Sequence, residues 1–126
     1  MKIPDFIRKI MIRRFGVRST EDKTFVIYNL MKEMQARKAA RPELYDLEVK
    51  YGTSEFYTCV VVEAMFGKKA RDWLFSVWLK HLGDSHGQVF FKNQWRAFTG
   101  IDSPTVDLKI CALHRVLGMI ESGELQ

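Results

Sequence analysis

Residues 55–82 read EFYTCVVVEAMFGKKARDWLFSVWLKHL, and this stretch decides how the chain can fold. Its two halves, 55–66 and 68–82, are apolar on nearly every side of a helix, with Gly67 between them. A helix that is apolar all round must be buried all round. A chain of 126 residues has a high surface-to-volume ratio, so it struggles to bury two such helices. We therefore expect 55–82 to contact a second copy or a related regulator subunit; a central hairpin wrapped by the other helices is the alternative.

Outside this hairpin, helical spacing of apolar residues dominates the chain. Pro4 can open a first helix that Gly16 ends, and Ser19 or Thr20 can cap a second helix that runs to about Ala40. The other segments expected from the spacing are a short helix over 41–51, the hairpin over 53–82 and a further pair of helices over 91–123, with a short β-strand near 88–91 as an option. The sequence thus predicts an all-α fold of about six or seven helices in a single domain, 1–126.

Composition excludes several classes of protein. Hydrophobic residues make up 47% and charged residues 28%, which suits a globular domain rather than a disordered or collagen-like chain. Two cysteines cannot form a disulfide framework, and no apolar run approaches the ~20 residues of a membrane span. Arg8, Lys9, Arg13 and Arg14 interrupt the first apolar stretch, which excludes a signal-peptide core. We expect a cytoplasmic protein.

The positive charge is concentrated in the first third of the chain. Residues 1–41 hold eleven Lys and Arg against four acids, a net +7, whereas residues 42–126 carry a net −2. A basic arm ahead of a near-neutral body suggests contact with a nucleic-acid backbone. Arg8, Arg13 and Arg14 are the candidate contacts; the plain alternative is a solvated helix surface.

The first helix is also amphipathic. Ile3, Phe6/Ile7, Ile10 and Phe15 form an apolar stripe opposite its bases, a pattern compatible with an anionic membrane surface. The same stripe would pack equally well on a protein core. We therefore do not expect a membrane partner.

The most informative motif lies near the C-terminus. Residues 94–106 read QWRAFTGIDSPTV, with Ile110 and Leu113 following at helical spacing. Trp95 and Phe98 would face inward from a short first helix, Gly100 would take the tight turn, and Asp102 or Ser103 would cap the next helix. Over about 91–123, this segment resembles the helix-turn-helix of winged and tri-helical DNA-binding regulators.

The resemblance implies a recognition helix from about Ser103, whose first residues would meet base edges in the major groove. The DNA-contacting residues it implies are Ser103, Thr105, Asp107 and Lys109 at the bases, with Lys92 and Arg96 on phosphate. The prediction is a dimeric DNA-binding transcriptional regulator. The alternative is a non-enzymatic adaptor or inhibitor that docks through its apolar helices on a larger regulator or on RNA polymerase.

Sequence motifs for catalysis are not found. The chain has no glycine-rich phosphate loop, and its three histidines and two cysteines lack the close spacing of a structural zinc site. Glu63 stands alone on an apolar helix: it could be a buried acid with a raised pKa, but a salt bridge to Lys68, Lys69 or Arg71 is the simpler account. We expect no enzyme, no cofactor and no metal.

Overall fold

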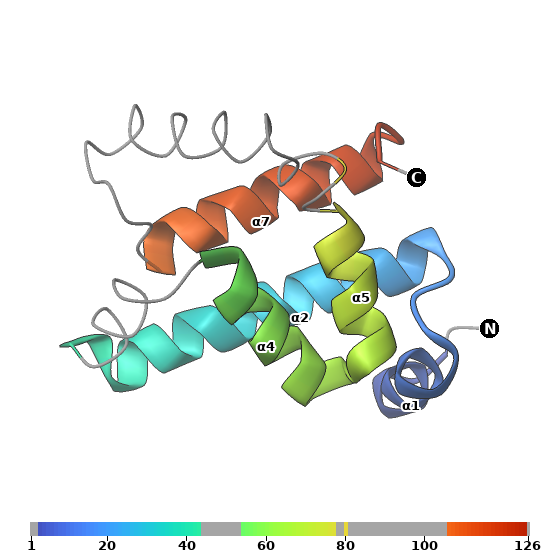
Figure 1. The fold of residues 1–126 in the computed structure, drawn as a ribbon, viewed down its shortest axis with the longest axis horizontal. Coiled ribbons are helices and arrows are strands. Elements are labelled where there is room, and N and C mark those ends of the chain that lie inside the picture. Colours follow the sequence, from blue (N-terminus) through green and yellow to red (C-terminus); the bar gives the residue numbers. More distant parts are fainter. Residues whose placement is uncertain (1–2, 44–53, 78–79, 81–105, 126) are drawn as a thin grey trace.

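The computed structural model describes residues 3–43, 54–77, 80 and 106–125, with the side chains of 54–57 and 106–108 left out. Within these ranges the chain forms five helices and no strand: α1 (Asp5–Phe15), α2 (Thr20–Ala40), α4 (Ser54–Phe66), α5 (Lys68–Val77) and α7 (Val106–Glu121) (Figure 1). The all-α prediction is confirmed for this part of the chain. The predicted helix over 41–51, the optional strand near 88–91 and the first helix and turn of the helix-turn-helix lie essentially outside it.

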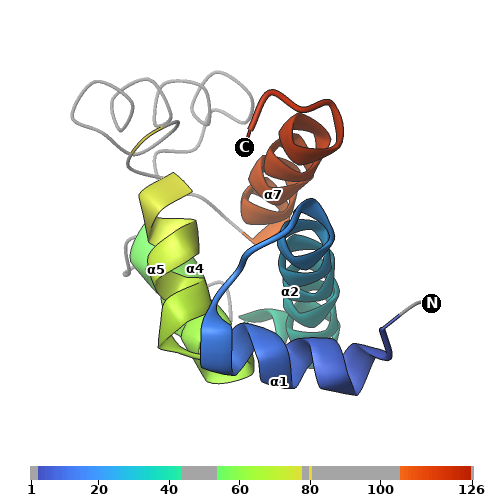
Figure 2. The ribbon, with the colours of Figure 1, turned by 90° about the vertical axis from the view of Figure 1, so that its right-hand side faces the viewer.

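The helices form two pairs that face each other across the core. α2 packs along α7, and α4 packs against α5. Figure 2 shows these pairs on opposite sides of the molecule, with α1 crossing beneath one end of both. α1 packs mainly on α5 and α4, so it bridges the turn of the predicted hairpin.

The first two helices begin and end where the sequence predicts. α1 follows Pro4 and stops at Gly16, whose φ of 88° is the left-handed conformation that glycine adopts most readily. α2 follows Ser19, and the hydroxyl oxygen of Ser19 accepts a hydrogen bond from the backbone N–H of Asp22 at 3.1 Å. That bond satisfies one of the amide groups left without a partner in the first turn of a helix.

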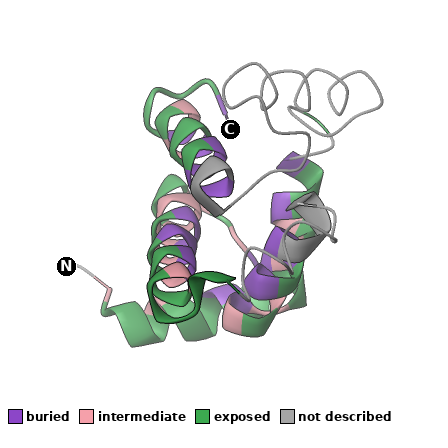
Figure 3. Ribbon diagram, turned by 90° about the vertical axis from the view of Figure 1, so that its left-hand side faces the viewer, coloured by how far each residue is buried: buried purple, intermediate pink, exposed green. Residues whose placement is uncertain are grey.

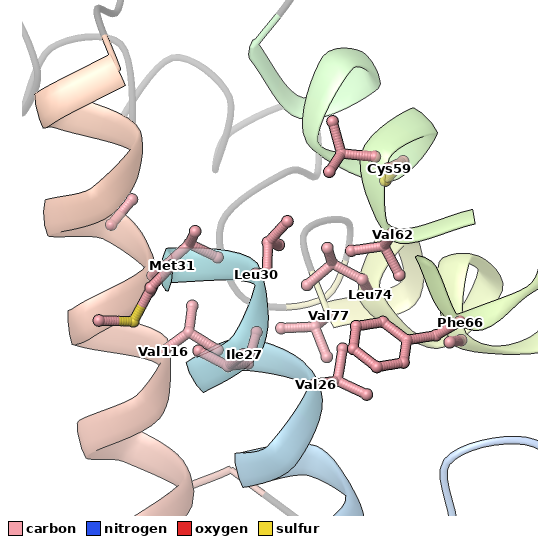
Figure 4. Packing of buried hydrophobic residues seen from close by; sticks show 14 of the residues in the cluster. Val26, Ile27, Leu30, Met31, Cys59, Val62, Phe66, Leu74, Val77 and Val116 are labelled. Atoms are coloured by element: carbon pink, nitrogen blue, oxygen red, sulfur yellow. The ribbon is translucent and has the colours of Figure 1, made fainter. Parts of the chain in front are cut away.

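The core lies between the two helix pairs, as the close-up in Figure 4 shows. Val26 and Leu30 of α2 point toward Phe66 and Leu74 of α4 and α5, whereas Ile27 lies beside Val116 of α7. The ring of Phe66 meets Phe25 edge-on, with 5.7 Å between ring centroids. The buried apolar residues are Ile12, Val26, Ile27, Leu30, Met31, Met34, Cys59, Val61, Val62, Phe66, Ala70, Leu74, Val77, Ile110, Ala112, Leu113, Val116, Ile120 and Leu125.

The spacing of Phe25, Tyr28, Met31 and Met34 in the sequence predicts that all four lie on the apolar side of α2, and for Tyr28 this is wrong. Tyr28 is exposed, because α2 turns Val26, Ile27 and Leu30 toward the core and leaves position 28 outside that arc. Its ring instead lies 4.6 Å from the ammonium of Lys32 on the surface.

The apolar hairpin supplies much of this core. Gly67, with φ of 94°, joins α4 to α5, and the described part of the predicted 68–82 helix ends as α5 at Val77. Thr58, Cys59, Val61, Val62 and Phe66 of α4 are all buried. Among the described helices, none combines the length and the apolar character needed to cross a bilayer.

Candidate functional site

Ile12 determines which side of α1 faces the protein. Its side chain is fully buried, and on this helix no other residue is. Residues on a helix advance about 100° each, so Ile10 lies about 160° and Phe6 about 120° around the helix from Ile12. Phe6 is accordingly 67% exposed and Ile10 60% exposed. The apolar stripe predicted from the sequence therefore points away from the core, and α1 appears mostly in the exposed colour (Figure 3).

Polar contacts hold α1 in this orientation. The Arg8 guanidinium forms a salt bridge with Asp22 of α2 at 2.6 Å, and both side chains are 15% exposed. Nη2 of Arg13 donates hydrogen bonds to the carbonyl oxygens of Ala64 (3.3 Å) and Met65 (3.0 Å). These carbonyls belong to the last turn of α4, where a cation also complements the negative end of the helix dipole.

The C-terminal end of α1 approaches the α4–α5 turn closely. Nζ of Lys69 donates a 2.6 Å hydrogen bond to the carbonyl oxygen of Arg14. Gly67 makes this approach possible, since a Cβ at that position would stand 3.0 Å from Cγ of Arg13. The orientation of α1 is thus fixed at both of its ends, by α2 near Arg8 and by the hairpin near Arg14.

Five large apolar side chains of α1 are exposed, and together they cover about half of the helix circumference. We call them the outer face: Phe6, Ile7, Ile10, Met11 and Phe15. They form two rows with i, i+4 spacing, Phe6–Ile10 and Ile7–Met11–Phe15, so neighbouring side chains adjoin along the helix. Adjoining exposed apolar residues on the surface of a small protein commonly mark a site of contact with another molecule.

Exposed cations surround the last residue of the outer face. The guanidinium carbons of Arg14 and Arg18 each lie 5.7 Å from the ring centroid of Phe15, which is 51% exposed. Lys69 adds a third exposed cation, joined to the Arg14 backbone. We call Arg14, Arg18 and Lys69 the basic end. The nearby carboxylate, Asp22, is already paired with Arg8, and its second oxygen accepts from the Arg18 backbone N–H at 3.3 Å.

The three N-terminal residues predicted to contact DNA do not all lie free at the surface for such a contact. Arg8 is engaged with Asp22 and Arg13 with the end of α4, so both serve the internal contacts of the chain. Arg14 remains a surface cation. Sequence reasoning missed Arg18 and Lys69. The position of Arg18 three residues after Phe15 was a readable signal, whereas Lys69 joins the site only through the fold.

Lys109 does not lie where the helix-turn-helix resemblance places it. Its side chain is 1% exposed, because α7 turns positions 109, 113 and 116 toward α2 and the core. In this structure its ammonium cannot reach a duplex. The other predicted DNA contacts, Lys92, Arg96, Ser103 and Thr105, lie outside the described residues, and the side chain of Asp107 does so as well.

Most of the described part of the hairpin that was predicted to contact a second subunit is buried in the core of its own chain. Val62, Phe66 and Leu74 are buried within one molecule, which fits the central-hairpin alternative. Val60 and Phe75 remain partly exposed on α4 and α5. Self-association through 55–82 stays a prediction.

The described residues offer little acid–base or metal chemistry. Glu63 pairs with Arg71 at 3.0 Å, the simpler of the two accounts given by the sequence. The pKa of Arg71 is raised, first by its hydrogen bond to Asp72 and then by Glu63, so this guanidinium stays charged. No group of three potential metal ligands occurs in the ranges that the structure describes. An open groove of about 440 Å³ between α1 and α2 is lined by Phe25, Tyr28 and Lys32, among others. Its described residues include no cluster of potential metal ligands.

Comparison with known proteins adds no relative. Neither a protein-family model, nor a curated protein, nor a solved structure matches the chain significantly.

Proposed function

We propose that this chain is a non-enzymatic protein that binds an anionic surface through the basic end, at the C-terminal end of α1. The observation that carries the proposal is the basic end: Arg14 and Arg18 lie next to the exposed ring of Phe15, and the exposed Lys69 is joined to the Arg14 backbone. Residues 1–41 hold a net +7, so the local cluster lies within a broader positive region. Clustered cations attract a polyanion and accelerate its association.

The finer form of this proposal is the DNA-binding transcriptional regulator. It rests on the resemblance over 91–123 and on the charge of residues 1–41, with Ser103 and Thr105 as the remaining candidates for base contact. Two copies would place two recognition helices on one face of the duplex and compensate for weak binding by each.

A second candidate is the adaptor or inhibitor that binds a protein. The outer face favours it, because a partner protein could cover Phe6 and Ile10 as well as pair with the basic end. This candidate differs from the first in its dependence on salt: contacts with phosphate weaken steeply as salt rises, whereas apolar contacts do not.

The experiment measures binding of the full chain to heparin–agarose and to a fluorescent random-sequence duplex over a range of salt concentrations. The basic-end variant carries Arg14→Gln, Arg18→Gln and Lys69→Gln. The matched control carries Lys32→Gln, Arg37→Gln and Arg41→Gln, which removes the same charge from the surface of α2.

We expect the wild-type chain to bind at low salt and the basic-end variant to bind more weakly than the control. If the duplex occupies this site, the slope of log K against log salt should fall by about three for the basic-end variant. Absence of binding to both probes at low salt, or equal loss in the two variants, would refute the proposal.

A further inference from the structure

On the basis of the proposed binding to an anionic surface, we propose that this surface is a lipid bilayer and that α1 lies flat on it. The outer face enters the boundary between headgroups and acyl chains, and the basic end contacts lipid phosphates. Amphipathic helices with Phe and Ile on one side and cations beside them bind anionic membranes in this way.

The apolar part of the surface separates a bilayer from a nucleic acid. Phosphate groups along a duplex can pair with Arg14 and Arg18, but they leave Phe6 and Ile10 in water. A bilayer takes up both kinds of group at once, since apolar side chains insert below the level at which cations meet phosphate. Phe15 combines the two, because the guanidinium carbons of Arg14 and Arg18 each lie 5.7 Å from the centroid of its exposed ring.

The position of α1 suits contact with a flat surface. Figure 2 shows α1 at one edge of the molecule, with the other described helices all on its inner side. Eleven residues of helix extend for about 16 Å. On the helical wheel, the exposed Ile7, Ile10 and Met11 lie in the middle of the outer face, and Phe6 and Phe15 form its two edges.

Two charged residues on α1 must be accommodated by this arrangement. Arg14 continues the Phe6–Ile10 row at i+4, so it lies within the apolar stripe and not, as predicted from the sequence, opposite it. Its long side chain can extend toward phosphate while its stem stays among the apolar groups. Asp5 is exposed in the first turn, at the opposite end of α1 from the basic end. The basic end and the single acid of α1 are therefore separated along the helix.

A second copy of the chain fits the outer face less well than a bilayer. Pairing two outer faces would bring together two sets of Arg14, Arg18 and Lys69, and like charges repel. On α1 itself the acid is Asp5, in the first turn, at the opposite end of the helix from the basic end. An anionic bilayer supplies the complementary charge.

The helix is formed before it meets the membrane, which distinguishes this proposal from folding on the bilayer. Arg8 and Arg13 attach α1 to α2 and α4, so little ordering is needed on binding. Helix content measured by circular dichroism should therefore change little when vesicles are added. A flexible peptide with the same composition would gain helix instead.

The test is flotation of the full chain with vesicles of phosphatidylcholine alone or with about one third phosphatidylserine. The outer-face variant carries Phe6→Ser and Ile10→Ser. The matched control carries Val60→Ser and Phe75→Ser, two apolar side chains of comparable exposure on α4 and α5. Circular dichroism checks that each variant remains folded.

We expect the wild-type chain to bind the anionic vesicles at least about tenfold more tightly than the neutral ones. The outer-face variant should lose at least about tenfold in affinity for them, and the control should retain it. A fluorophore attached at Ile10→Cys, in a Cys111→Ser background, should report a less polar environment on binding, since Cys59 is buried and Cys111 is exposed.

Failure to float with anionic vesicles, or equal flotation of the outer-face variant, would overturn the bilayer proposal. If the chain then still binds duplex or heparin in a manner that depends on the basic end, the proposed anionic-surface function stands without the lipid. Loss of binding to every anionic probe would instead remove the proposed function as well.

Discussion

Replacing Gly67 with alanine tests whether α1 lies across the hairpin as the structure has it. Gly67 has φ of 94°, and this left-handed backbone conformation destabilises the folded state by about 1–2 kcal/mol for any residue with a Cβ. The new Cβ would also stand 3.0 Å from Cγ of Arg13, and relieving that overlap costs about 1–2 kcal/mol more. We expect Gly67→Ala to lower the free energy of unfolding by about 2–4 kcal/mol.

Gly123 provides the matched control. Its φ is 82°, and nothing lies within 4 Å of a Cβ built there. The only cost of Gly123→Ala is therefore the strain of the left-handed backbone. Urea unfolding followed by circular dichroism should show Gly67→Ala to be less stable than Gly123→Ala by about 1–2 kcal/mol. A thermal melt should place it lower by several degrees.

A double-mutant cycle identifies the contact itself. Arg13→Ala removes Cγ, so the overlap should vanish in the Gly67→Ala/Arg13→Ala chain. The double variant should then be about 1 kcal/mol more stable than the sum of the single effects predicts. Equal destabilisation by the two glycine substitutions, together with strict additivity in the cycle, would show that α1 does not contact this turn. The orientation of the outer face would then lose its support.

Three other substitutions test the core and the helix ends by urea unfolding. Phe66→Ala should cost about 3–5 kcal/mol, because the ring is 1% exposed and packs edge-on against Phe25, whereas Val60→Ala at the surface should cost far less; similar losses would contradict the packing. Gly118→Ala should stabilise the chain by about 0.5–1 kcal/mol, because position 118 is helical and open; a loss of stability there would mean that α7 breaks at this residue. Ser19→Ala should cost about 1 kcal/mol by removing the cap on Asp22, and no change would show that the cap does not form in solution.

Helix boundaries could be predicted from the sequence because their causes are local. Pro4, Gly16 and Ser19 affect the backbone within one helical turn. In the structure, α1 begins after Pro4 and ends before Gly16, and α2 begins after Ser19. The same holds for Gly67 between α4 and α5. The apolar hairpin was also recognisable from its composition as a part of the core, although Val60 and Phe75 remain exposed.

The rotation of each helix about its axis was less predictable. The stripe of α1 could face either the core or a partner, and the single buried residue Ile12 decided between them. On α2 the inward arc is set by Val26, Ile27 and Leu30, which leaves Tyr28 outside. The helix-turn-helix resemblance placed Lys109 on the exposed side of a recognition helix, yet α7 turns it inward.

The candidate site shows the same division. The amino-acid sequence alone established a helical chain, a strongly basic first third and a first helix with both apolar and cationic residues, because these depend on residue type and short-range spacing. The tertiary structure decided that Arg8 and Arg13 hold α1 in place, that Lys69 joins Arg14 and Arg18, and that Phe6 and Ile10 face outward. The packing of α1 on α2 and on the α4–α5 turn produces these outcomes through contacts between residues as many as 55 positions apart, which no local pattern encodes.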